Sequence, residues 1–186
     1  MPDFDSIEQN KPERAGRSLE LAERSIDRCV RIIEELNNYA RVKNLDISEN
    51  SLDYWLRTTI DEQIIPENIQ VELELSCDVQ VQFDKGKLHQ VVNNLLSNSV
   101  HALQDENSNG KLLQISTHLL DDICEIRVCD NGVGMSNDTK EKLFEPLFST
   151  KVFGVGLGMV IVKNIVEQHH GEVLVESKVG AGTSIN

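Results

Sequence analysis

Two glycine clusters, about twenty residues apart, constrain the fold of this chain more than any other feature. The first reads Asp-Asn-Gly-Val-Gly-Met at residues 130–135, and the second reads Gly-Val-Gly-Leu-Gly at residues 154–158. Residues 123–129 alternate and are rich in β-formers, which predicts a strand that ends at Asp130. The second cluster opens an apolar helical pattern, with Gly171 as the expected residue just beyond the helix. Each cluster therefore lies at the end of an element, where glycine lets another group approach the backbone closely.

Each cluster taken alone also has a plain interpretation. Asp130, followed by Gly132 and Gly134, could accept a hydrogen bond from a ligand. Asp-Asn-Gly is equally good turn chemistry, and for this cluster alone the turn is the better interpretation. Glycines that lead into a helix present free N–H groups and the positive end of the helix dipole, which suits a phosphate. A dinucleotide-binding motif would use Glu176 as the acidic residue that binds the ribose, but no strand runs into Gly154. A P-loop is excluded because its Gly-Lys-Ser/Thr ending is absent from the sequence.

A helix with amides on one side precedes both clusters. Asp84 is a good N-cap residue, and apolar residues then recur with helical spacing. This apolar side carries Leu88, Val91, Val92, Leu95, Leu96, Ser99, Val100 and Leu103. The opposite side carries four polar residues within roughly 80° of one another, namely Gln90, Asn94, Asn98 and His101.

The grouped amides have two interpretations. The first is an exposed polar face. A solvated helix face usually carries Lys and Glu, because Asn costs more free energy in a helix, so this interpretation is the weaker one. The stronger one is that Asn98 offers its amide oxygen to a hard cation. Mg²⁺ fits, since it takes few protein ligands and keeps phosphate oxygens and waters. The helix and the two glycine clusters together predict a pocket for a nucleotide and its metal ion.

Four segments, in this order, resemble the sequence boxes of the catalytic, ATP-binding domain of sensor histidine kinases, which is related to the gyrase-type ATPases. Residues 90–103 resemble the N box and residues 130–135 the G1 box. Residues 143–148, Leu-Phe-Glu-Pro-Leu-Phe, resemble the F box, and residues 154–159 the G2 box. The resemblance runs from about Ile47 to the end of the chain, and four boxes in the right order make it highly specific.

The resemblance implies a role for each matching position. Asn98 would be the Mg²⁺ ligand, and Asn94 would be a polar neighbour of the phosphates and the metal. Asp130 would accept a hydrogen bond from the adenine amino group. The residues that would lie around the adenine are Gly132, Gly134 and Thr183.

The resemblance also implies a short lid that closes over ATP, formed by the segment between Met135 and Gly154. Phe148 and Lys151 would belong to this lid, and Phe148 would face the acceptor helix. The far hinge of the lid, near the phosphates, would be formed by Gly154, Gly156, Leu157 and Gly158.

Two positions depart from the family pattern. Many members have Lys where this chain has His101. We expect His101 to contact a phosphate, but this expectation does not follow from the family pattern. Gyrase-type ATPases have a glutamate, which activates the attacking water, where this chain has Asn94. An amide cannot take that proton. The sequence therefore favours phosphoryl transfer to another acceptor over efficient hydrolysis.

A separate apolar pattern predicts an amino-terminal helix over residues 15–43. Its seam follows three- and four-residue spacing over three heptads, at Leu19, Ala22, Ile26, Cys29, Ile33, Leu36 and Ala40. One such helix needs a partner from this chain or from a second copy, unless it packs as a surface helix on its own domain. Residues 25–41 resemble the second helix of the histidine kinase dimerisation domain. We therefore expect a partial dimerisation helix in residues 1–44 and the catalytic domain in residues 45–186.

In the family, the first dimerisation helix carries the phosphorylated histidine, and no segment of this sequence matches it. None of the five histidines has the surroundings of an acceptor; they are His89, His101, His118, His169 and His170. We expect the chain to be part of a longer kinase. Its expected partners are an acceptor-histidine helix, a homodimer partner and the receiver domain of a response regulator.

Charge and cysteine content bear on location and partners. The formal net charge of −13 argues against general nucleic-acid binding and against binding to anionic membranes. The four cysteines form no CxxC pair, which indicates reduced cytoplasmic thiols rather than a zinc site or a disulfide framework. No apolar run in the sequence approaches the roughly eighteen residues of a membrane span. We expect a cytoplasmic location without direct membrane contact, although an anchor could lie elsewhere in an intact protein.

The expected elements predict an α+β fold, a two-layer sandwich in which a mixed β-sheet is covered by helices on one face and preceded by the long helix. Strands are expected near residues 45–47, 69–75, 79–83, 112–119, 123–129 and 172–177, and from residue 183. A helix capped by Ser51 is expected to end near residue 63, and the amide helix near residue 104. The lid is expected to close the other face of the sheet.

These features predict a sensor histidine kinase catalytic fragment that binds Mg²⁺ and ATP and transfers the γ-phosphoryl group to a histidine on a dimerisation helix. The alternative is a nucleotide-binding or dimerisation module that does no phosphotransfer in this form. A third possibility, a hydrolysing ATPase, is disfavoured by the amide of Asn94.

Overall fold

The computed structural model describes residues 45–104, 110–151 and 154–186, together with eight separate positions before residue 31. These eight positions are helical and exposed; they are Gly16, Leu19, Ala22, Glu23, Ser25, Ile26, Cys29 and Val30. They agree with the predicted amino-terminal helix. The remaining positions of the predicted seam, Ile33, Leu36 and Ala40, lie outside the described residues.

Five strands form one mixed sheet. In spatial order they are β2 (Gln70–Leu75), β4 (Leu112–Leu120), β5 (Ile123–Asp130), β7 (Gly182–Ile185) and β6 (Val175–Lys178). Strands β2 and β4 run parallel, and the other neighbouring pairs are antiparallel. Two further strands, β1 (Ser48–Ser51) and β3 (Gln80–Phe83), pair antiparallel with each other. The register sets Asp130 opposite Thr183, so two residues of the predicted adenine site meet at the end of β5.

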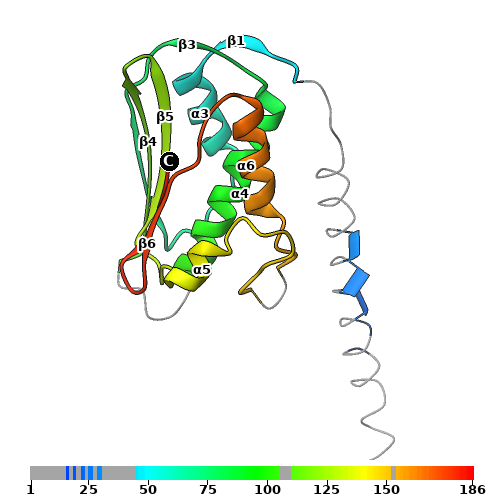
Figure 1. Ribbon diagram of the computed structural model, residues 1–186. Helices are drawn as coiled ribbons and strands as arrows, with labels where there is room; N and C mark the ends of the chain where they lie inside the picture. Colours follow the sequence, from blue (N-terminus) through cyan, green and yellow to red (C-terminus); the bar gives the residue numbers. More distant parts are fainter. Residues whose placement is uncertain are drawn as a thin grey trace, which may run out of the picture.

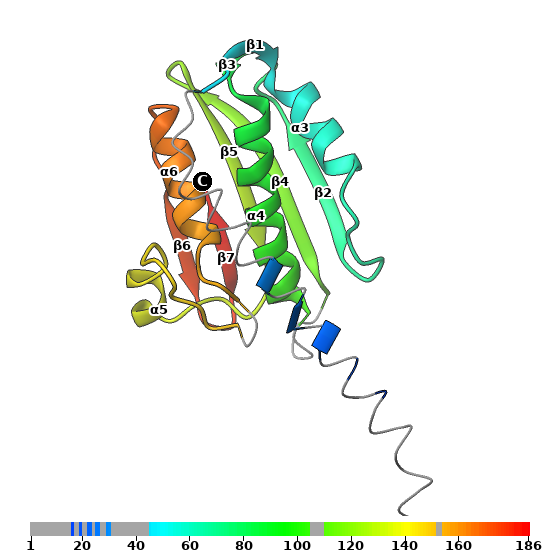
Figure 2. The same cartoon turned by 90° about the vertical axis from the view of Figure 1, so that its right-hand side faces the viewer.

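Three helices cover one face of the five-stranded sheet, as Figures 1 and 2 show from two sides. They are α3 (Leu52–Asp61), α4 (Lys85–Leu103) and α6 (Gly158–Gln168). The core between helices and sheet includes Leu95 and Leu96 of α4, Val162 of α6, and Leu113 and Ile115 of β4. Burying each such side chain contributes about 1.5–3 kcal/mol, so this interface fixes which side of α4 remains polar. The predicted α+β sandwich is confirmed.

Helix α4 begins at a capping residue that also joins other parts of the domain. Asp84 accepts a hydrogen bond through Oδ1 from the backbone N–H of Lys87 at 3.0 Å, as an N-cap should. Its Oδ2 accepts from the N–H of Asp46 at 2.9 Å, and its own N–H donates to Nε2 of His169 at 3.1 Å. The start of α4 is thereby tied to the end of α6. The predicted caps at Asp84 and at Ser51 are both confirmed.

The end of α6 differs by one residue from the prediction. His170, with φ of 62°, adopts the left-handed conformation that was expected at Gly171. The N–H of His170 donates to the carbonyl of Glu167 at 3.0 Å, and that of Gly171 to Val166 at 2.9 Å. This pair of bonds is the Schellman arrangement. Gly171 therefore stands one position further along than predicted.

Two short elements also differ from the sequence interpretation. Strand β1 lies at residues 48–51 instead of 45–47, because its polar Ser-Glu-Asn-Ser sequence is specified by pairing with β3 and not by its own propensity. The helix α5 (Asn137–Glu141), capped by Ser136, was not predicted. Its five residues are too few to show a helical period.

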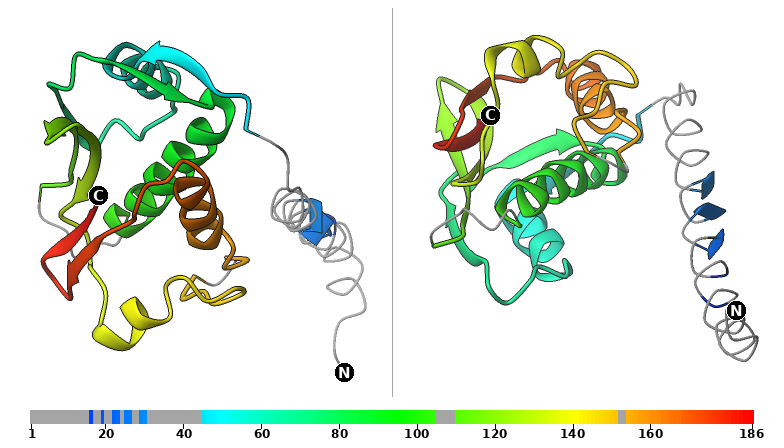
Figure 3. Two further views of the ribbon diagram at one scale, coloured as in Figure 1. Left: turned by 45° about the horizontal axis from the view of Figure 1, so that its top comes forward. Right: turned by 90° about the horizontal axis from the view of Figure 1, so that it is seen from below.

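The lid does not close the other face of the sheet, so that prediction is wrong. Helix α5 and the segment that follows it lie at one end of the helix layer, near the start of α6 (Figures 1 and 3). In the described part of the chain, no element covers the opposite face of the sheet (Figure 1).

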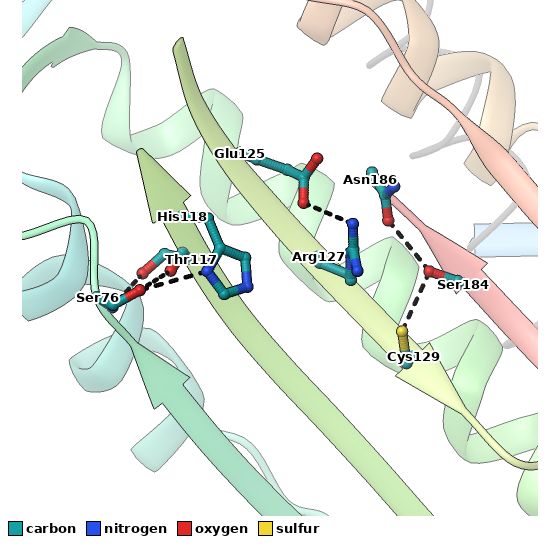
Figure 4. A network of polar contacts seen from close by, with 8 residues as sticks. All are labelled: Ser76, Thr117, His118, Glu125, Arg127, Cys129, Ser184 and Asn186. Atoms are coloured by element: carbon teal, nitrogen blue, oxygen red, sulfur yellow. Dashed lines mark hydrogen bonds and ion pairs between the residues drawn. The ribbon is translucent and has the colours of Figure 1, made fainter. Parts of the chain in front are cut away.

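Several polar side chains on that open face contact one another (Figure 4). Arg127 lies 3.0 Å from the carboxylate of Glu125 on the same strand. The thiol of Cys129 contacts the hydroxyl of Ser184 at 3.1 Å, and this hydroxyl donates to Oδ1 of Asn186 at 3.1 Å. A face with this polar pattern is normal for an antiparallel sheet in contact with water.

Candidate functional site

Asp130 closes β5 with a side chain that is only 9% exposed. Its Oδ1 accepts a hydrogen bond from the N–H of Gly132 at 3.0 Å. The hydroxyl of Ser99 on α4 and the backbone N–H of Thr183 on β7 also donate to this carboxylate. Burial raises the pKa of Asp130 above its ordinary value, and these three hydrogen bonds oppose the shift. Three elements therefore converge on one buried carboxylate.

The turn that follows, residues 130–135, is fixed between α4 and the β6–β7 hairpin; we call it the G1 turn. Val133 donates its N–H to the carbonyl of Ala102 at 3.4 Å and accepts a hydrogen bond from the hairpin at 2.8 Å. A Cβ at Gly132 would lie 2.7 Å from that Ala102 oxygen. A Cβ at Gly134, whose φ is +65°, would overlap a backbone carbonyl of β6. Only glycine allows this close approach.

A second group of polar side chains, Asn94, Asn98, His101 and Lys151, lies where the polar side of α4 meets the lid; we call it the amide cluster. Oδ1 of Asn98 accepts a hydrogen bond from Nζ of Lys151 at 2.7 Å. An ammonium group only donates, so the amide atom that faces it must be the oxygen. The predicted metal ligand therefore turns its oxygen toward a positive charge.

Asn94 lies against the first turn of α6. Its Nδ2 donates to the carbonyl of Gln90 at 2.9 Å, which leaves Oδ1 directed elsewhere. A Cβ at Gly158, the first residue of α6, would lie 3.0 Å from that oxygen. Leu157 stands at the N-cap position and its apolar side chain makes no capping hydrogen bond. The N–H groups of the first turn of α6 thus lack a side-chain cap, beside an amide of α4.

His101 is one turn further along α4 and is exposed overall. Partial burial of its ring lowers the pKa of His101, and the positive charge of Lys151 lowers it further. The ring is therefore in the neighbourhood of the same lysine that contacts Asn98. Whether it contacts a phosphate stays a prediction.

Backbone contacts join the later part of the lid to the predicted far hinge. Leu147 donates its N–H to the carbonyl of Gly156 at 3.0 Å, and Gly154 donates to the carbonyl of Lys151 at 3.2 Å. A Cβ at Gly156, whose φ is +77°, would overlap the carbonyl of Phe148. Phe148 is half-buried beside this hinge. The predicted lid residues are therefore adjacent to the predicted far hinge.

A divalent cation fits this donor set. Within the described ranges there is no group of three His, Cys, Asp or Glu side chains that could hold a metal by itself. Asn98 offers one amide oxygen that already accepts from a cation. Mg²⁺ commonly takes one or two protein ligands and completes its shell with phosphate oxygens and waters. The residues suit a metal that arrives with a nucleotide.

The sequence interpretation missed one residue of the site. Ser99 was counted in the apolar stripe of α4, and it is buried as that position requires. Its hydroxyl nevertheless donates to Asp130. A single hydroxyl within an otherwise apolar stripe was the signal, because a buried hydroxyl needs a partner.

The family model described as histidine kinase-, DNA gyrase B- and HSP90-like ATPase matches residues 83–186, which is more than half of the chain. The chain belongs to this family. The matched segment begins just before α4 and contains the G1 turn, the amide cluster and α6.

Curated relatives are kinases of the bacterial sensor type. Sporulation kinase E of Bacillus subtilis is 32% identical over 162 residues, which make up 85% of this chain and 22% of that kinase. Sporulation kinase B of the same species is 31% identical over 185 residues, which make up 97% of this chain and 42% of that kinase. The chain thus spans less than half the length of either relative.

Solved structures share the fold. The catalytic domain of the histidine kinase ThkA superimposes with a TM-score of 0.65 and 25% identity, over 76% of this chain and 93% of that domain. ThkA in complex with the response regulator protein TrrA gives a TM-score of 0.74 at 24% identity, over 94% of this chain and 50% of that one. Full-length ShkA in complex with AMPPNP gives a TM-score of 0.74 at 20% identity, over 91% of this chain and 37% of that one. Within the ATPase family, the chain is an ATP-binding catalytic domain of the sensor histidine kinase type.

None of the helices in the described ranges combines the length and the apolar character that crossing a membrane requires.

Proposed function

We propose that this chain binds Mg²⁺ and ATP and transfers the γ-phosphoryl group to a histidine on a dimerisation helix, from which it passes to the receiver domain of a response regulator. One observation carries the proposal. Helix α4 donates to the buried Asp130 through Ser99 and, one residue earlier, presents Asn98 to the lysine of the lid. A single rigid element thus connects a site suited to a base with a site suited to phosphates.

Asp130 is proposed to bind the adenine. A carboxylate has about four acceptor positions, and three donors from the protein occupy part of this capacity. The remainder suits one N–H of an adenine amino group. Gly132 and Gly134 let the G1 turn pack closely against α4 and β6 and would shape the wall beside the adenine, and Thr183 lies next to the carboxylate on β7. Guanine has a carbonyl oxygen at the corresponding position, so the same carboxylate would reject it.

The start of α6 is proposed to bind the phosphates. Its first-turn N–H groups and the helix dipole favour an anion, and Gly154, Gly156, Leu157 and Gly158 bring the chain to that point. Asn94 would orient the phosphates, since its amide lies against Gly158. These local donors matter because the chain as a whole carries a net charge of −13.

Asn98 is proposed to hold Mg²⁺ by its amide oxygen. When bound, the ion would supply positive charge that offsets the negative charge of the phosphate oxygens. Lys151 donates to that oxygen in the structure described above, so it would have to leave Asn98 for the ion to bind. The ammonium group of Lys151 from the lid and the ring of His101 from α4 would then face the phosphates.

Phosphoryl transfer asks the protein mainly for positioning and for stabilisation of charge. The acceptor nitrogen would attack the γ-phosphorus while the bond to the leaving oxygen of ADP breaks. Asn94 cannot deprotonate a water molecule, which favours transfer over hydrolysis. Phe148, half-buried in the lid, would face the incoming acceptor helix.

The amino-terminal residues are proposed to meet the partners. Residues 1–44 would form part of a dimerisation helix and residues 45–186 the catalytic domain. Leu19 is 65% exposed and Ile26 is 62% exposed at helical positions one heptad apart, which supports packing against an acceptor-histidine helix and a homodimer partner. We propose a cytoplasmic reaction without nucleic-acid binding or direct membrane contact.

Labelled phosphate distinguishes this proposal from its alternative. The chain would be mixed with ATP labelled at the γ-phosphate and with an acceptor-helix domain from a related kinase. Acid-labile, base-stable label on the acceptor is the expected result. Measurable ATP binding without label on the acceptor would favour a nucleotide-binding or dimerisation module. Rapid release of phosphate without acceptor would instead indicate an ATPase.

A further inference from the structure

Two cysteines that the proposed function does not use lie in direct contact at the other end of the sheet. Cys77 follows β2, and Cys124 is the second residue of β5. Their Sγ atoms are 2.8 Å apart, although the residues are 47 positions apart in the chain. Cys77 is 2% exposed, whereas Cys124 is partly exposed. Of the cysteines in the described residues, Cys29 is exposed and Cys129 contacts a serine, so only these two thiols form a pair.

The backbone around Cys77 is anchored on both sides. Its own N–H donates to Oγ1 of Thr117 at 3.3 Å. That hydroxyl donates to Asp53 at 2.6 Å, and the N–H of Asp78 donates to the other oxygen of Asp53 at 3.0 Å. Cys124 is held in the β4–β5 ladder. The two sulfur atoms are therefore brought together by fixed backbone on either side and not by free side-chain rotation.

We propose that Cys77 and Cys124 form a redox modification site, at which a hydroperoxide converts the two thiols into an intramolecular disulfide. The sulfur atoms need to approach by less than about 1 Å to reach bonding distance. Such a shift is within the range of small side-chain rotations. Cys77 is a buried member of the apolar cluster that contains Leu52 and Phe83. Cys124 packs against this cluster and is itself partly exposed, so an oxidant reaches the pair at Cys124.

The reaction proceeds in two steps that balance. The thiolate of Cys124 attacks one oxygen of hydrogen peroxide, the O–O bond breaks, and a sulfenic acid and hydroxide form. The sulfur of Cys77 then attacks the sulfenic sulfur; the S–S bond forms, the S–O bond breaks, and the hydroxyl group leaves with the Cys77 proton as water. The two thiols lose two electrons and the peroxide gains them. A dithiol reductant reverses the change.

The order of the steps follows from the surroundings of the two thiols. Burial, the contact with Cys124 and the charge of Asp53 together raise the pKa of Cys77 to about 12. Cys77 therefore stays protonated and shielded, and it acts second. Cys124, the more exposed of the two, meets the oxidant first.

The site is separate from the proposed nucleotide site. Cys124 and Asp130 are six residues apart on β5, which corresponds to about 20 Å along a strand. The disulfide would close a long loop of the chain, so its main effect is to restrict the unfolded state. We expect oxidation to raise the unfolding temperature by roughly 5–10 °C, while ATP affinity changes less than twofold.

Peptide mapping of the unaltered protein tests the proposal directly. The protein would be treated with a small molar excess of hydrogen peroxide, alkylated in denaturant, and digested without reductant. The expected product is one peptide pair joined through Cys77 and Cys124, lighter than the two thiol peptides by two hydrogen atoms. Overoxidised Cys124 with a still alkylatable Cys77, or a disulfide that instead includes Cys29 or Cys129, would overturn it.

Single variants separate the two thiols. In Cys77→Ser, peroxide should leave a sulfenic acid on Cys124 that dimedone traps, whereas the unaltered protein should trap little. Cys29→Ser is the matched control, and it should keep both the cross-link and the rise in unfolding temperature. A rise that persists in Cys124→Ser would contradict the proposal. Since these readouts need no nucleotide, they stand or fall independently of the proposed kinase function.

Discussion

The G1 turn and the amide cluster both contact helix α4 but differ in how complete they are. Around Asp130, three protein donors converge and two glycines pack against backbone carbonyls. At the amide cluster, by contrast, the amide oxygen of Asn98 is held by a lysine of the lid, and the start of α6 has no side-chain cap. One region is built from backbone and buried groups, and the other from side chains that have alternative partners.

This difference suggests a division of labour. The base would bind to a preformed surface, which costs little conformational entropy. The phosphates and the ion would complete the second region by replacing contacts within the protein. Substitutions in the G1 turn should therefore affect the fold as well as binding, whereas substitutions in the amide cluster should affect mainly the response to magnesium.

The largest effect is expected for Gly134→Ala. Both Gly134 and Gly180 have positive φ, but only a Cβ at Gly134 would overlap backbone, since nothing lies within 4 Å of one at Gly180. Left-handed strain alone costs about 1–2 kcal/mol, which is the loss expected for the control Gly180→Ala. Gly134→Ala should lose about 3–5 kcal/mol of unfolding free energy, measured by urea denaturation. Equal losses in the two variants would contradict a tightly packed G1 turn.

The next largest effect is expected for Asp130→Asn. The substitution removes a charged acceptor, so ATP affinity should fall by about 1.5–3 kcal/mol, which is roughly tenfold to more than a hundredfold. GTP, which this carboxylate does not favour, should lose less, and the preference for ATP should shrink. Competition with a fluorescent nucleotide measures both affinities. Asp122→Asn, in the exposed turn just before β5, is the control, and an unchanged ATP preference in Asp130→Asn would refute the role in base binding.

The elements that carry the G1 turn and the asparagines were easier to predict than the contact between the asparagines and the lid, for a physical reason. The alternation of β5 and the asparagine side of α4 are periodic features of short segments, and both appear in the structure where expected. The contact between Lys151 and Asn98 joins residues 53 positions apart. No local pattern specifies such a contact, because it depends on where the lid packs.

Features outside the site show the same limit. Strand β1 was misplaced because its pairing with β3 overrides its polar sequence. The lid was expected over the open face, yet that face carries polar side chains such as Arg127 and Glu125, which form an ion pair with each other. In both cases, the position is decided by partners distant in the sequence.

Asn98→Ala should show a smaller and conditional effect. It should weaken ATP binding about tenfold in magnesium, which corresponds to about 1.4 kcal/mol, and much less in EDTA. Alanine favours the helix more than asparagine does, so α4 should remain folded. Asn93→Ala is the matched control, because Asn93 contacts His89 on the same helix and not the lid. Equal weakening in magnesium and in EDTA would remove Asn98 from the metal site.

Lys151→Met tests the exchange of partners at Asn98 with a still smaller effect. The variant loses a cation near the phosphates, so binding in EDTA should weaken. It also frees the amide oxygen of Asn98, so the gain in affinity on adding magnesium should rise by roughly twofold to fivefold, below about 1 kcal/mol. The ratio of the dissociation constants in EDTA and in magnesium, measured by calorimetry, isolates this term. A ratio equal to that of the unaltered protein would mean that Lys151 and the ion do not compete.

The smallest effect concerns acid. Burial raises the pKa of Asp130 from the ordinary 3.8, so the folded protein holds this proton more readily than the unfolded chain does. The stability that Asp130 contributes is therefore fully present below that ordinary pKa and is lost as pH rises through the raised one. Asp130→Asn does not titrate, so the difference in unfolding free energy between the unaltered protein and the variant should decline with rising pH across this window. Hydrogen bonds from Gly132, Ser99 and Thr183 oppose the shift, so the decline of this difference with pH should be small. A difference in unfolding free energy that stays constant across the pH range would contradict the prediction. It would show that these donors solvate the carboxylate as well as water does, and that the G1 turn accepts a charged Asp130 more readily than its burial suggests.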